Sequence, residues 1–199
     1  MTVTDVNVVK SAIFERPDDA NKGTLGSLLC VCGSYGMAGA AVMSAKGALR
    51  TGIGLAKCAL PRSIYPIVAQ TILESVYYPL SENADGRISK VNVPFLVSES
   101  CKSSATLVGC GLGVCDDTLK IVFSLIENST TPLVLDADAL NCVAKQPEIL
   151  LRKKAPIIIT PHPGEMSRLT GLATPLVNAE RERVALDFAQ KYGVVTVLK

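Results

Sequence analysis

The stretch Ile157-Ile158-Ile159-Thr160-Pro161-His162-Pro163-Gly164-Glu165 passes from an apolar run, through two prolines, into a polar segment. Three consecutive isoleucines before such a break are typical of a strand that is buried on both faces of a parallel sheet. Met166 and Leu169 follow at the spacing of one helix face. The stretch therefore predicts a strand, a loop and a helix in succession.

The same succession recurs along the chain at intervals that suit strand–helix units. We expect strands at Ser27–Cys32, Leu55–Leu60, Ser75–Tyr78, Ala105–Gly109, Leu133–Leu135, Ile157–Thr160 and Val194–Leu198. We expect further helices at Gly39–Thr51, Asp116–Glu127 and Leu176–Tyr192. This alternation predicts an α/β fold with a mostly parallel sheet that is covered by helices on both faces. In such sheets, ligands bind where loops leave the carboxyl ends of the strands.

The composition fits one globular domain that spans residues 1–199. Hydrophobic residues make up 48% of the chain, and no repeat or long linker divides it. The net charge of +2 is spread along the sequence, which argues against nucleic acid or an anionic membrane as a partner. Met1–Lys10 lacks the pattern of a secretory signal, and no uninterrupted apolar run reaches the ~18 residues of a transmembrane helix. We therefore expect a cytoplasmic protein.

Seven cysteines and a single histidine, His162, limit the metal and disulfide chemistry that the chain can support. The cysteine count is odd, and Cys30, Cys32, Cys58 and Cys110 lie inside or beside apolar runs. Such residues are typical of buried free thiols in a reducing compartment. The sequence has no Cys-x-x-Cys pair, so a zinc site is not expected.

Two glycine-rich segments each connect a predicted strand to a predicted helix. Gly33–Ala40 lacks the spacing of a dinucleotide-binding loop and the lysine of a P-loop, so an ordinary turn explains it as well as a ligand loop does. Gly109–Gly113 has glycine at every second position, which favours a ligand-facing loop over a tight strand–helix corner. In both segments, glycine permits close approach of the backbone, and the helix N-terminus offers free N–H groups to an anion.

Acidic side chains follow the last two strong strands. Asp136 and Asp138 are two residues apart, and on an extended segment their carboxylates project to the same side. Such a pair suits hydrated Mg²⁺ or hydrogen bonds to hydroxyl groups; alternatively, one of the two caps the next helix. Glu165 also has two interpretations, a contact in the ligand site beside His162 or a carboxylate that the helix dipole favours.

Taken together, these segments resemble the ADP/ATP-dependent NAD(P)H-hydrate dehydratase family of the ribokinase-like superfamily. The resemblance runs from about Asn21 to Lys199. It rests on Lys22-Gly23, Gly33-Ser34, Gly39-Ala40-Ala41, Ala48–Leu55, Gly109–Gly113, Leu135–Asn141 and Thr160–Glu165, of which the last two are the most specific. The resemblance implies a ribokinase-like three-layer αβα sandwich.

Members of this family repair NADH or NADPH that has been hydrated on the nicotinamide ring. They phosphorylate the hydroxyl group with ATP or ADP and then eliminate phosphate, which restores the ring double bond. The resemblance implies small-molecule nucleotides as partners, namely ATP or ADP with Mg²⁺ and the substrate NADHX or NADPHX, and a homo-oligomer.

The resemblance also implies roles for particular residues. Three residues would contact the hydrated nucleotide: Ala40, Gly113 and His162. Glu165 would act on the metal through water, and Lys199 would contact the phosphates of ATP or ADP. The same site would be lined by Asp136, Asp138 and Asn141.

The chain departs from the family pattern in two places. Asn21-Lys22-Gly23 stands where the family has His-Lys-Gly. The family continues beyond the lysine of its Val-Leu-Lys strand with a Gly-Thr-Gly-Asp motif that supplies the anion hole and the catalytic base, whereas this sequence stops at Lys199. We therefore expect an incomplete C-terminal part of the fold, no catalytic base in these residues, and no turnover by the chain alone.

Two other functions stay open at this point. A ribokinase-like kinase for a vitamin precursor shares the fold and the glutamate, but Thr160–Glu165 argues against it because those kinases resemble a Pro-Asn version of the motif. A nucleotide-binding module without turnover is the other alternative, because the base-bearing segment is absent.

Overall fold

A computed structural model describes residues 6–7, 18, 20 and 23–199 of the chain. Asn21 and Lys22 of the first motif lie outside the described residues. Within them, seven strands form one sheet in the order β3-β2-β1-β4-β5-β6-β7, and every neighbouring pair is parallel. The strands are β1 (Ser27–Val31), β2 (Leu55–Pro61), β3 (Val76–Leu80), β4 (Ala105–Val108), β5 (Leu133–Leu135), β6 (Ile157–Ile159) and β7 (Val195–Thr196).

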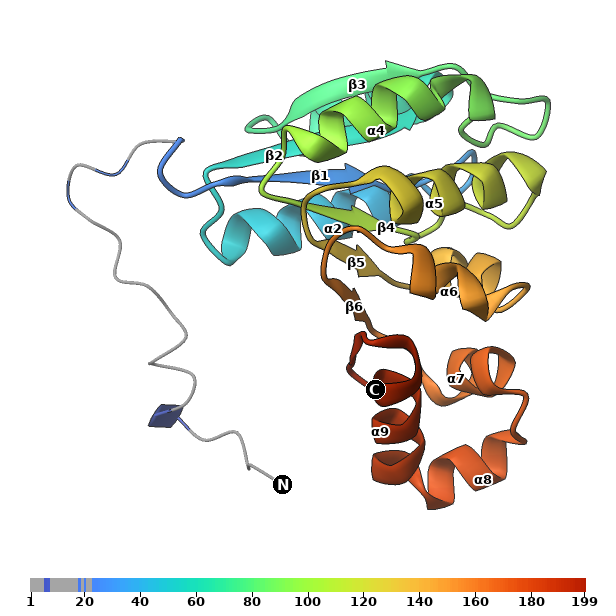
Figure 1. Ribbon diagram of the computed structural model, residues 1–199. Coiled ribbons are helices and arrows are strands. Elements are labelled where there is room, and N and C mark those ends of the chain that lie inside the picture. Colours follow the sequence, from blue (N-terminus) through green and yellow to red (C-terminus); the bar gives the residue numbers. More distant parts are fainter. Residues whose placement is uncertain (1–5, 8–17, 19, 21–22) are drawn as a thin grey trace.

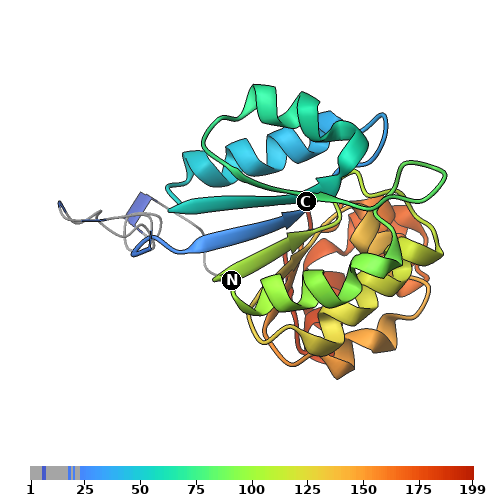
Figure 2. The same ribbon diagram turned by 90° about the horizontal axis from the view of Figure 1, so that it is seen from above.

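Helices cover both faces of this sheet (Figures 1 and 2). One face carries α2 (Ala38–Arg50) and α3 (Tyr65–Thr71), and the other carries α4 (Val93–Cys101), α5 (Asp116–Asn128) and α6 (Asp138–Val143). The helices after β6 are α7 (Pro163–Thr170), α8 (Thr174–Ala179) and α9 (Arg181–Tyr192), and short 3-10 turns lie at Arg62–Ile64, Lys90–Asn92 and Pro147–Arg152. The expected three-layer αβα arrangement is confirmed.

The central strand β1 shows why both faces need a helical layer. Its residues alternate in direction, so Leu29 and Val31 pack into the core on the α5 side. Cys30 and Cys32 pack into a second core with Ala41 of α2. All five side chains are at most 2% exposed, and the small alanine allows α2 to lie close to the sheet.

The ends and the number of elements differ in places from the sequence predictions. The single helix predicted at Leu176–Tyr192 is wrong, because Glu180 has φ −127° and ψ 38° and separates α8 from α9. The strand predicted at Val194–Leu198 is shorter, since β7 covers Val195–Thr196. Helices α3 and α4 were not predicted; both carry proline in the first turn, where its missing N–H costs nothing.

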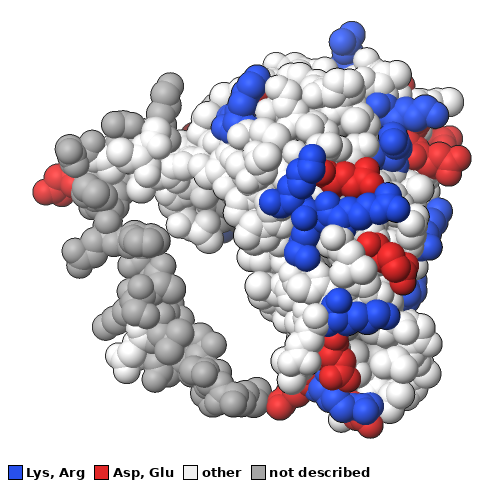
Figure 3. Space-filling view, viewed as in Figure 1, with Lys and Arg blue, Asp and Glu red and all other residues white. Residues whose placement is uncertain are grey.

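Two surface properties bear on the partners expected from the sequence. None of the helices in the described part of the chain is long and apolar enough to cross a membrane. On the face shown in Figure 3, Lys and Arg side chains are interspersed with Asp and Glu side chains. That face therefore has no extended patch of one sign, in keeping with the net charge of +2.

Candidate functional site

The two glycine-rich loops contact each other at the carboxyl edge of the sheet. The Gly33 N–H donates to the Cys110 carbonyl at 2.8 Å, and the buried Ser34 hydroxyl donates to the Gly111 carbonyl at 2.8 Å. A Cβ atom on Gly111 would lie 2.7 Å from Cβ of Ala40, in the first turn of α2. Two positions expected to contact one ligand, Ala40 and the Gly109–Gly113 loop, are therefore neighbours.

Asp138 joins the second glycine loop to the loop after β5. Its Oδ2 atom accepts the Gly113 N–H at 2.8 Å, and its Oδ1 atom accepts the Asn141 amide at 3.2 Å. The side-chain oxygen Oδ1 of Asn141 in turn accepts the Nε–H of Arg168, on α7, at 2.8 Å. A continuous hydrogen-bonded chain thus runs from the loop after β4 to the helix after β6. The N-cap of α6 is Ala137, which lacks a side-chain cap, so neither aspartate has the capping role that was the alternative.

Ala137 has an unusual backbone conformation that separates the roles of the two aspartates. Its φ of 51° and ψ of −117° make it the one non-glycine residue with positive φ among the described residues. The extended geometry assumed for Asp136 and Asp138 is therefore wrong, since the backbone turns sharply between them. Gly109 makes room for this turn, because a Cβ atom there would lie 1.8 Å from the Asp136 carbonyl oxygen. Strained residues of this kind cluster at functional sites.

Asp136 carries the charged contact of the site. Its Oδ1 atom lies 2.8 Å from Nζ of Lys199, and its Oδ2 atom accepts the Cys110 thiol at 3.7 Å. Burial opposes ionisation of Asp136, but hydrogen bonds from Lys199 and Thr160 outweigh it and lower its pKa. The Lys199 N–H donates to the Pro161 carbonyl at 2.9 Å, which holds Lys199 against the loop after β6.

His162 and Glu165 form the N-terminal cap of α7. Nδ1 of His162 accepts the Gly164 N–H at 3.0 Å, and Glu165 Oε2 accepts the His162 N–H at 2.9 Å. The other Glu165 oxygen lies 3.3 Å from His162 Nε2. The ring makes two of these contacts, with Nδ1 as the acceptor and Nε2 directed at the carboxylate. Glu165 therefore lies in the first turn of α7, and its buried carboxylate holds the half-exposed His162 ring in one orientation.

The described residues do not build a cage for a directly bound metal ion. They contain no group of three or more His, Cys, Asp or Glu side chains arranged to hold one. Glu165 already directs both oxygens to His162, and Asp136 is paired with Lys199. These carboxylates are compatible with contact to a hydrated Mg²⁺ through water, the form that Mg²⁺ often keeps in phosphate sites.

Several residues of this arrangement were not found from the sequence. Arg168 is joined to the site by a contact across the fold, and no local pattern marks it. Ser34 belongs to the first glycine-rich segment, but its contact with Gly111 was not predicted. Arg87, from the polar loop after β3, packs its Nε atom against Gly113, where an added Cβ would lie 2.5 Å away. In the same loop, the Gly86 carbonyl accepts a hydrogen bond from the Tyr35 N–H at 2.8 Å. In the sequence, this loop is marked by its polar residues and by the dipeptide Asp85-Gly86, which is typical of a turn.

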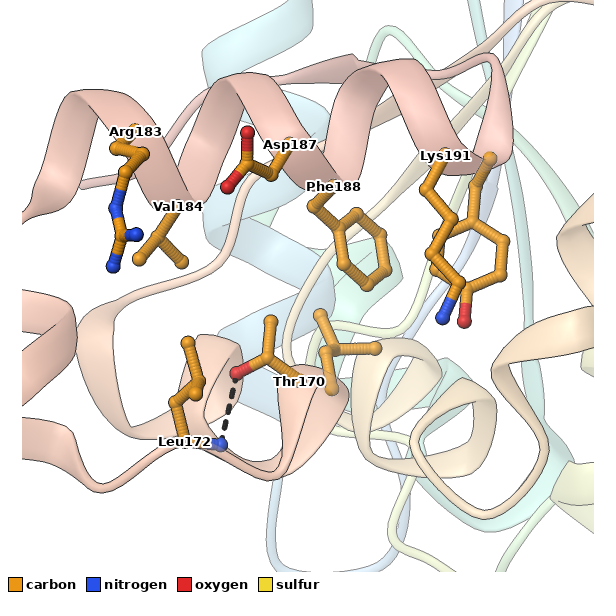
Figure 4. Close-up of a pocket in the computed structure, with 9 residues that line it drawn as sticks. Thr170, Leu172, Arg183, Val184, Asp187, Phe188 and Lys191 are labelled. Atoms are coloured by element: carbon orange, nitrogen blue, oxygen red, sulfur yellow. Dashed lines mark hydrogen bonds between the residues drawn. The ribbon is translucent and has the colours of Figure 1, made fainter.

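A pocket of about 330 Å³ lies elsewhere, between α9 and the segment that follows α7 (Figure 4). It combines apolar with charged side chains, and it is lined by Leu169, Thr170, Leu172, Arg183, Val184, Asp187, Phe188, Lys191 and Tyr192. None of the residues predicted for the site lines it. The candidate site is therefore the set of joined loops at the sheet edge.

Comparison with known proteins bears on this arrangement. Residues 28–199 match the family model for NAD(P)H-hydrate dehydratase. The chain is 38% identical over 184 residues to the bifunctional NAD(P)H-hydrate repair enzyme Nnr of Thermofilum pendens, with 92% of this chain and 35% of that protein covered. It is 31% identical over 187 residues to the ADP-dependent (S)-NAD(P)H-hydrate dehydratase of Neisseria meningitidis, with 92% and 59% covered.

A solved structure shows the same fold. The ADP/ATP-dependent NAD(P)H-hydrate dehydratase of Bacillus subtilis, co-crystallized with ATP/Mg²⁺, matches with a TM-score of 0.78 and 28% identity over 97% of this chain and 64% of that one. The chain spans about a third of the length of the bifunctional relatives such as that of Thermofilum pendens. This agreement favours the dehydratases over the vitamin-precursor kinases. By sequence and by fold, the chain belongs to the NAD(P)H-hydrate dehydratase family.

Proposed function

We propose that this chain forms the substrate-binding side of an enzyme that repairs hydrated NADH or NADPH with ATP or ADP. Family membership supports this proposal, as do the names of the relatives. The observation that carries it is the hydrogen-bonded chain Gly113–Asp138–Asn141–Arg168, which joins three loops at the ligand-binding edge of the sheet.

The proposed reaction has two steps. The hydroxyl oxygen of the hydrated ring loses its proton to a base and attacks the terminal phosphorus of ATP or ADP, whose bond to the bridging oxygen breaks so that ADP or AMP leaves. The C–O bond of the resulting phosphate ester then breaks, phosphate leaves with the bonding electrons, and loss of a proton from the neighbouring carbon restores the double bond. Because phosphate is a better leaving group than hydroxide, the protein's main tasks are positioning and charge stabilisation.

On the substrate side, we assign contacts to Ala40, Gly113 and His162. The N–H of Gly113 already donates to Asp138. Gly113 would therefore contact the substrate through its other backbone atoms. The His162 ring is half exposed, and the N-cap contacts hold it in place. A ring fixed in this way can pack its exposed face against a ligand without first losing side-chain freedom.

On the nucleotide side, we assign a phosphate contact to Lys199. The ion pair with Asp136 holds the ammonium group of Lys199 at the edge of the sheet, so its positive charge is already in place there. Mg²⁺, when bound, neutralises charge on the phosphates, and Glu165 would reach its water shell. Asp136, Asp138 and Asn141 hold the surrounding loops in place.

The test uses a polypeptide that contains these 199 residues and continues through the family's Gly-Thr-Gly-Asp segment. We expect ATP or ADP with Mg²⁺ to restore the near-ultraviolet absorbance of NADH from hydrated NADH. His162→Ala should raise KM for hydrated NADH more than it lowers the affinity for ATP. Phosphorylation of a vitamin-precursor alcohol, without recovery of NADH, would overturn the proposal.

We also propose that the protein is a homo-oligomer. Its α2–α3 layer exposes large apolar side chains, of which Met43 is 71% exposed, Ile67 56% and Leu73 83%. Large apolar side chains exposed on one layer are a common feature of association surfaces. Light scattering coupled to size-exclusion chromatography measures the assembled mass directly, and a monomer at micromolar concentration would contradict the proposal.

A further inference from the structure

Two cysteines lie on neighbouring segments just beyond the ends of β1 and β4. The Gly33 N–H donates to the Cys110 carbonyl at 2.8 Å, and the Gly109 N–H donates to the Val31 carbonyl at 3.2 Å. These two bonds continue the register of β1 and β4, so Cys110 lies opposite Gly33 and is a diagonal neighbour of Cys32 on the adjacent segment. Both side chains lie on the same side of the sheet and pack into the core beneath α2.

The two thiols differ in accessibility and in acidity. Cys32 is 1% exposed, whereas Cys110 is partly exposed. The hydrogen bond from Cys32 outweighs the opposing effect of burial and, with one from Ser44, lowers the pKa of Cys110 to about 7. The pKa of Cys32 is raised, mainly by the same contact with Cys110 and secondly by burial. At neutral pH, Cys110 is therefore the accessible nucleophile, and Cys32 is a protonated thiol directly beside it.

We propose that Cys32 and Cys110 are an oxidation site at which hydrogen peroxide produces a disulfide. The Cys110 thiolate attacks one peroxide oxygen, the O–O bond breaks, and hydroxide leaves to give a sulfenic acid on Cys110. The Cys32 sulfur then attacks the Cys110 sulfur, the S–O bond breaks, and the departing oxygen leaves as water with the Cys32 proton. Overall, two thiols and one hydrogen peroxide become one disulfide and two waters.

Oxidation would alter the candidate site as well as the thiols. Cys110 belongs to the Gly109–Gly113 loop, and its thiol donates to Asp136 at 3.7 Å in the reduced chain. A disulfide removes this donor and ties the loop covalently to the end of β1. The inference stands on the geometry of the pair and does not depend on the proposed dehydratase activity.

The first measurement counts thiols. The fully reduced 199-residue chain is treated with a small excess of hydrogen peroxide, unfolded, and labelled with iodoacetamide. We expect the number of labels to fall from the seven cysteines of the sequence to five, and to return to seven after dithiothreitol. A count that stays at seven would overturn the proposal.

The second measurement locates the bond. Trypsin releases residues 23–46, which contain Cys30 and Cys32, and residues 103–120, which contain Cys110 and Cys115. We expect these two peptides to be linked after oxidation. Cys110→Ser and Cys32→Ser should abolish the linked species, whereas the matched controls Cys115→Ser and Cys30→Ser should retain it.

The wild-type peptide map keeps the test decisive even if Cys32→Ser, which alters a buried side chain, fails to fold. A linked species that persists in Cys110→Ser would overturn the assignment. So would a loss of thiols confined to Cys101, the exposed cysteine of α4, through a bond between two chains.

Discussion

The two sides of the candidate site are held together by different kinds of contact. On the β1–β4–β5 side, the contacts Ser34–Gly111 and Gly113–Asp138 each use a backbone atom, and Ser34 is 5% exposed. On the β6–β7 side, Lys199 and Asp136 form an ion pair whose side chains are 47% and 24% exposed. Bonds anchored on a buried backbone fix a loop, whereas exposed ion pairs contribute little and rearrange easily. We infer that the first side is preformed and that the second adjusts to its ligand.

The largest effect expected from this contrast is on turnover. A polypeptide of these 199 residues should bind ligand on its preformed side and yet show no dehydratase activity, because the sequence has no Gly-Thr-Gly-Asp segment to supply the base. Loss of a base alone typically lowers the rate by about 10²–10⁴-fold. Calorimetry with hydrated NADH and the NADH recovery assay measure the two properties separately. A rate comparable to that of the extended polypeptide would place the base within these residues.

The largest effect on stability is expected at Gly109, where the preformed side is most crowded. Gly109→Ala should destabilise the fold by more than about 3 kcal/mol, because a strained backbone costs about 1–3 kcal/mol before any overlap is counted. Gly109 has φ +130°, and the added Cβ would lie 1.8 Å from a backbone oxygen that cannot move aside. Urea unfolding measures the change.

The matched control for this substitution is Gly47→Ala in α2, where an added Cβ meets no atom within 4 Å. Alanine there should stabilise the helix by about 0.5–1 kcal/mol. Equal effects of the two substitutions would show that the Gly109 corner is not rigid.

A smaller effect is expected when the link between the loops is cut. Asp138→Ala should cost about 1–3 kcal/mol, because it leaves the Gly113 N–H without its acceptor. Asp116→Ala is the control, since Asp116 is an exposed aspartate in the first turn of α5. There the loss should stay near 0.3–1 kcal/mol, about the value of a dipole interaction. Equal losses of stability at the two positions would show that Asp138 contributes only as a charge at the start of a helix and not through its bond to Gly113.

The sequence was sufficient to locate the edge of the sheet at which the site lies. Ile157–Ile159 and Leu133–Leu135 are strands because short β-branched or leucine runs suit a sheet that is buried on both faces. The residues that follow such strands in a parallel sheet must meet at one edge. The predicted strands alone therefore place His162 and Gly113 at the same edge of the sheet, without any knowledge of the contacts there.

The contacts at that edge could not be predicted from the sequence. The turn at Ala137 exists because Gly109 of another strand leaves room for it, so its cause is more than twenty residues away. The partnership of Arg168 with Asn141 likewise depends on how α7 packs beside α6. Local sequence patterns are enough to predict where the strands lie. Which side chains pair across the loops depends on the assembled sheet and cannot be read from those patterns.

The smallest expected effect concerns the adjustable side of the site and depends on pH. Although burial opposes it, the hydrogen bond from Lys199 contributes to the lowered pKa of Asp136. A lowered carboxylate pKa adds stability above its unfolded value, near 3.9, and that contribution is lost as the pH falls through the folded value. Lys199→Met should therefore reduce stability at pH 7 by no more than about 1 kcal/mol. The difference from the unmodified chain should vanish in acid.

Urea unfolding at neutral and acidic pH measures this difference, and an NMR titration of Asp136 should show its pKa moving upward in the variant. Lys120→Met is the control, because it removes an exposed lysine from α5 and should leave the Asp136 titration unchanged. If Lys199→Met leaves the pKa of Asp136 where it was, the remaining hydrogen bonds hold that carboxylate charged. The Lys199 ammonium could then bind a phosphate without changing the ionisation of Asp136. The ion pair would in that case hold the β6–β7 side of the site less firmly than we infer.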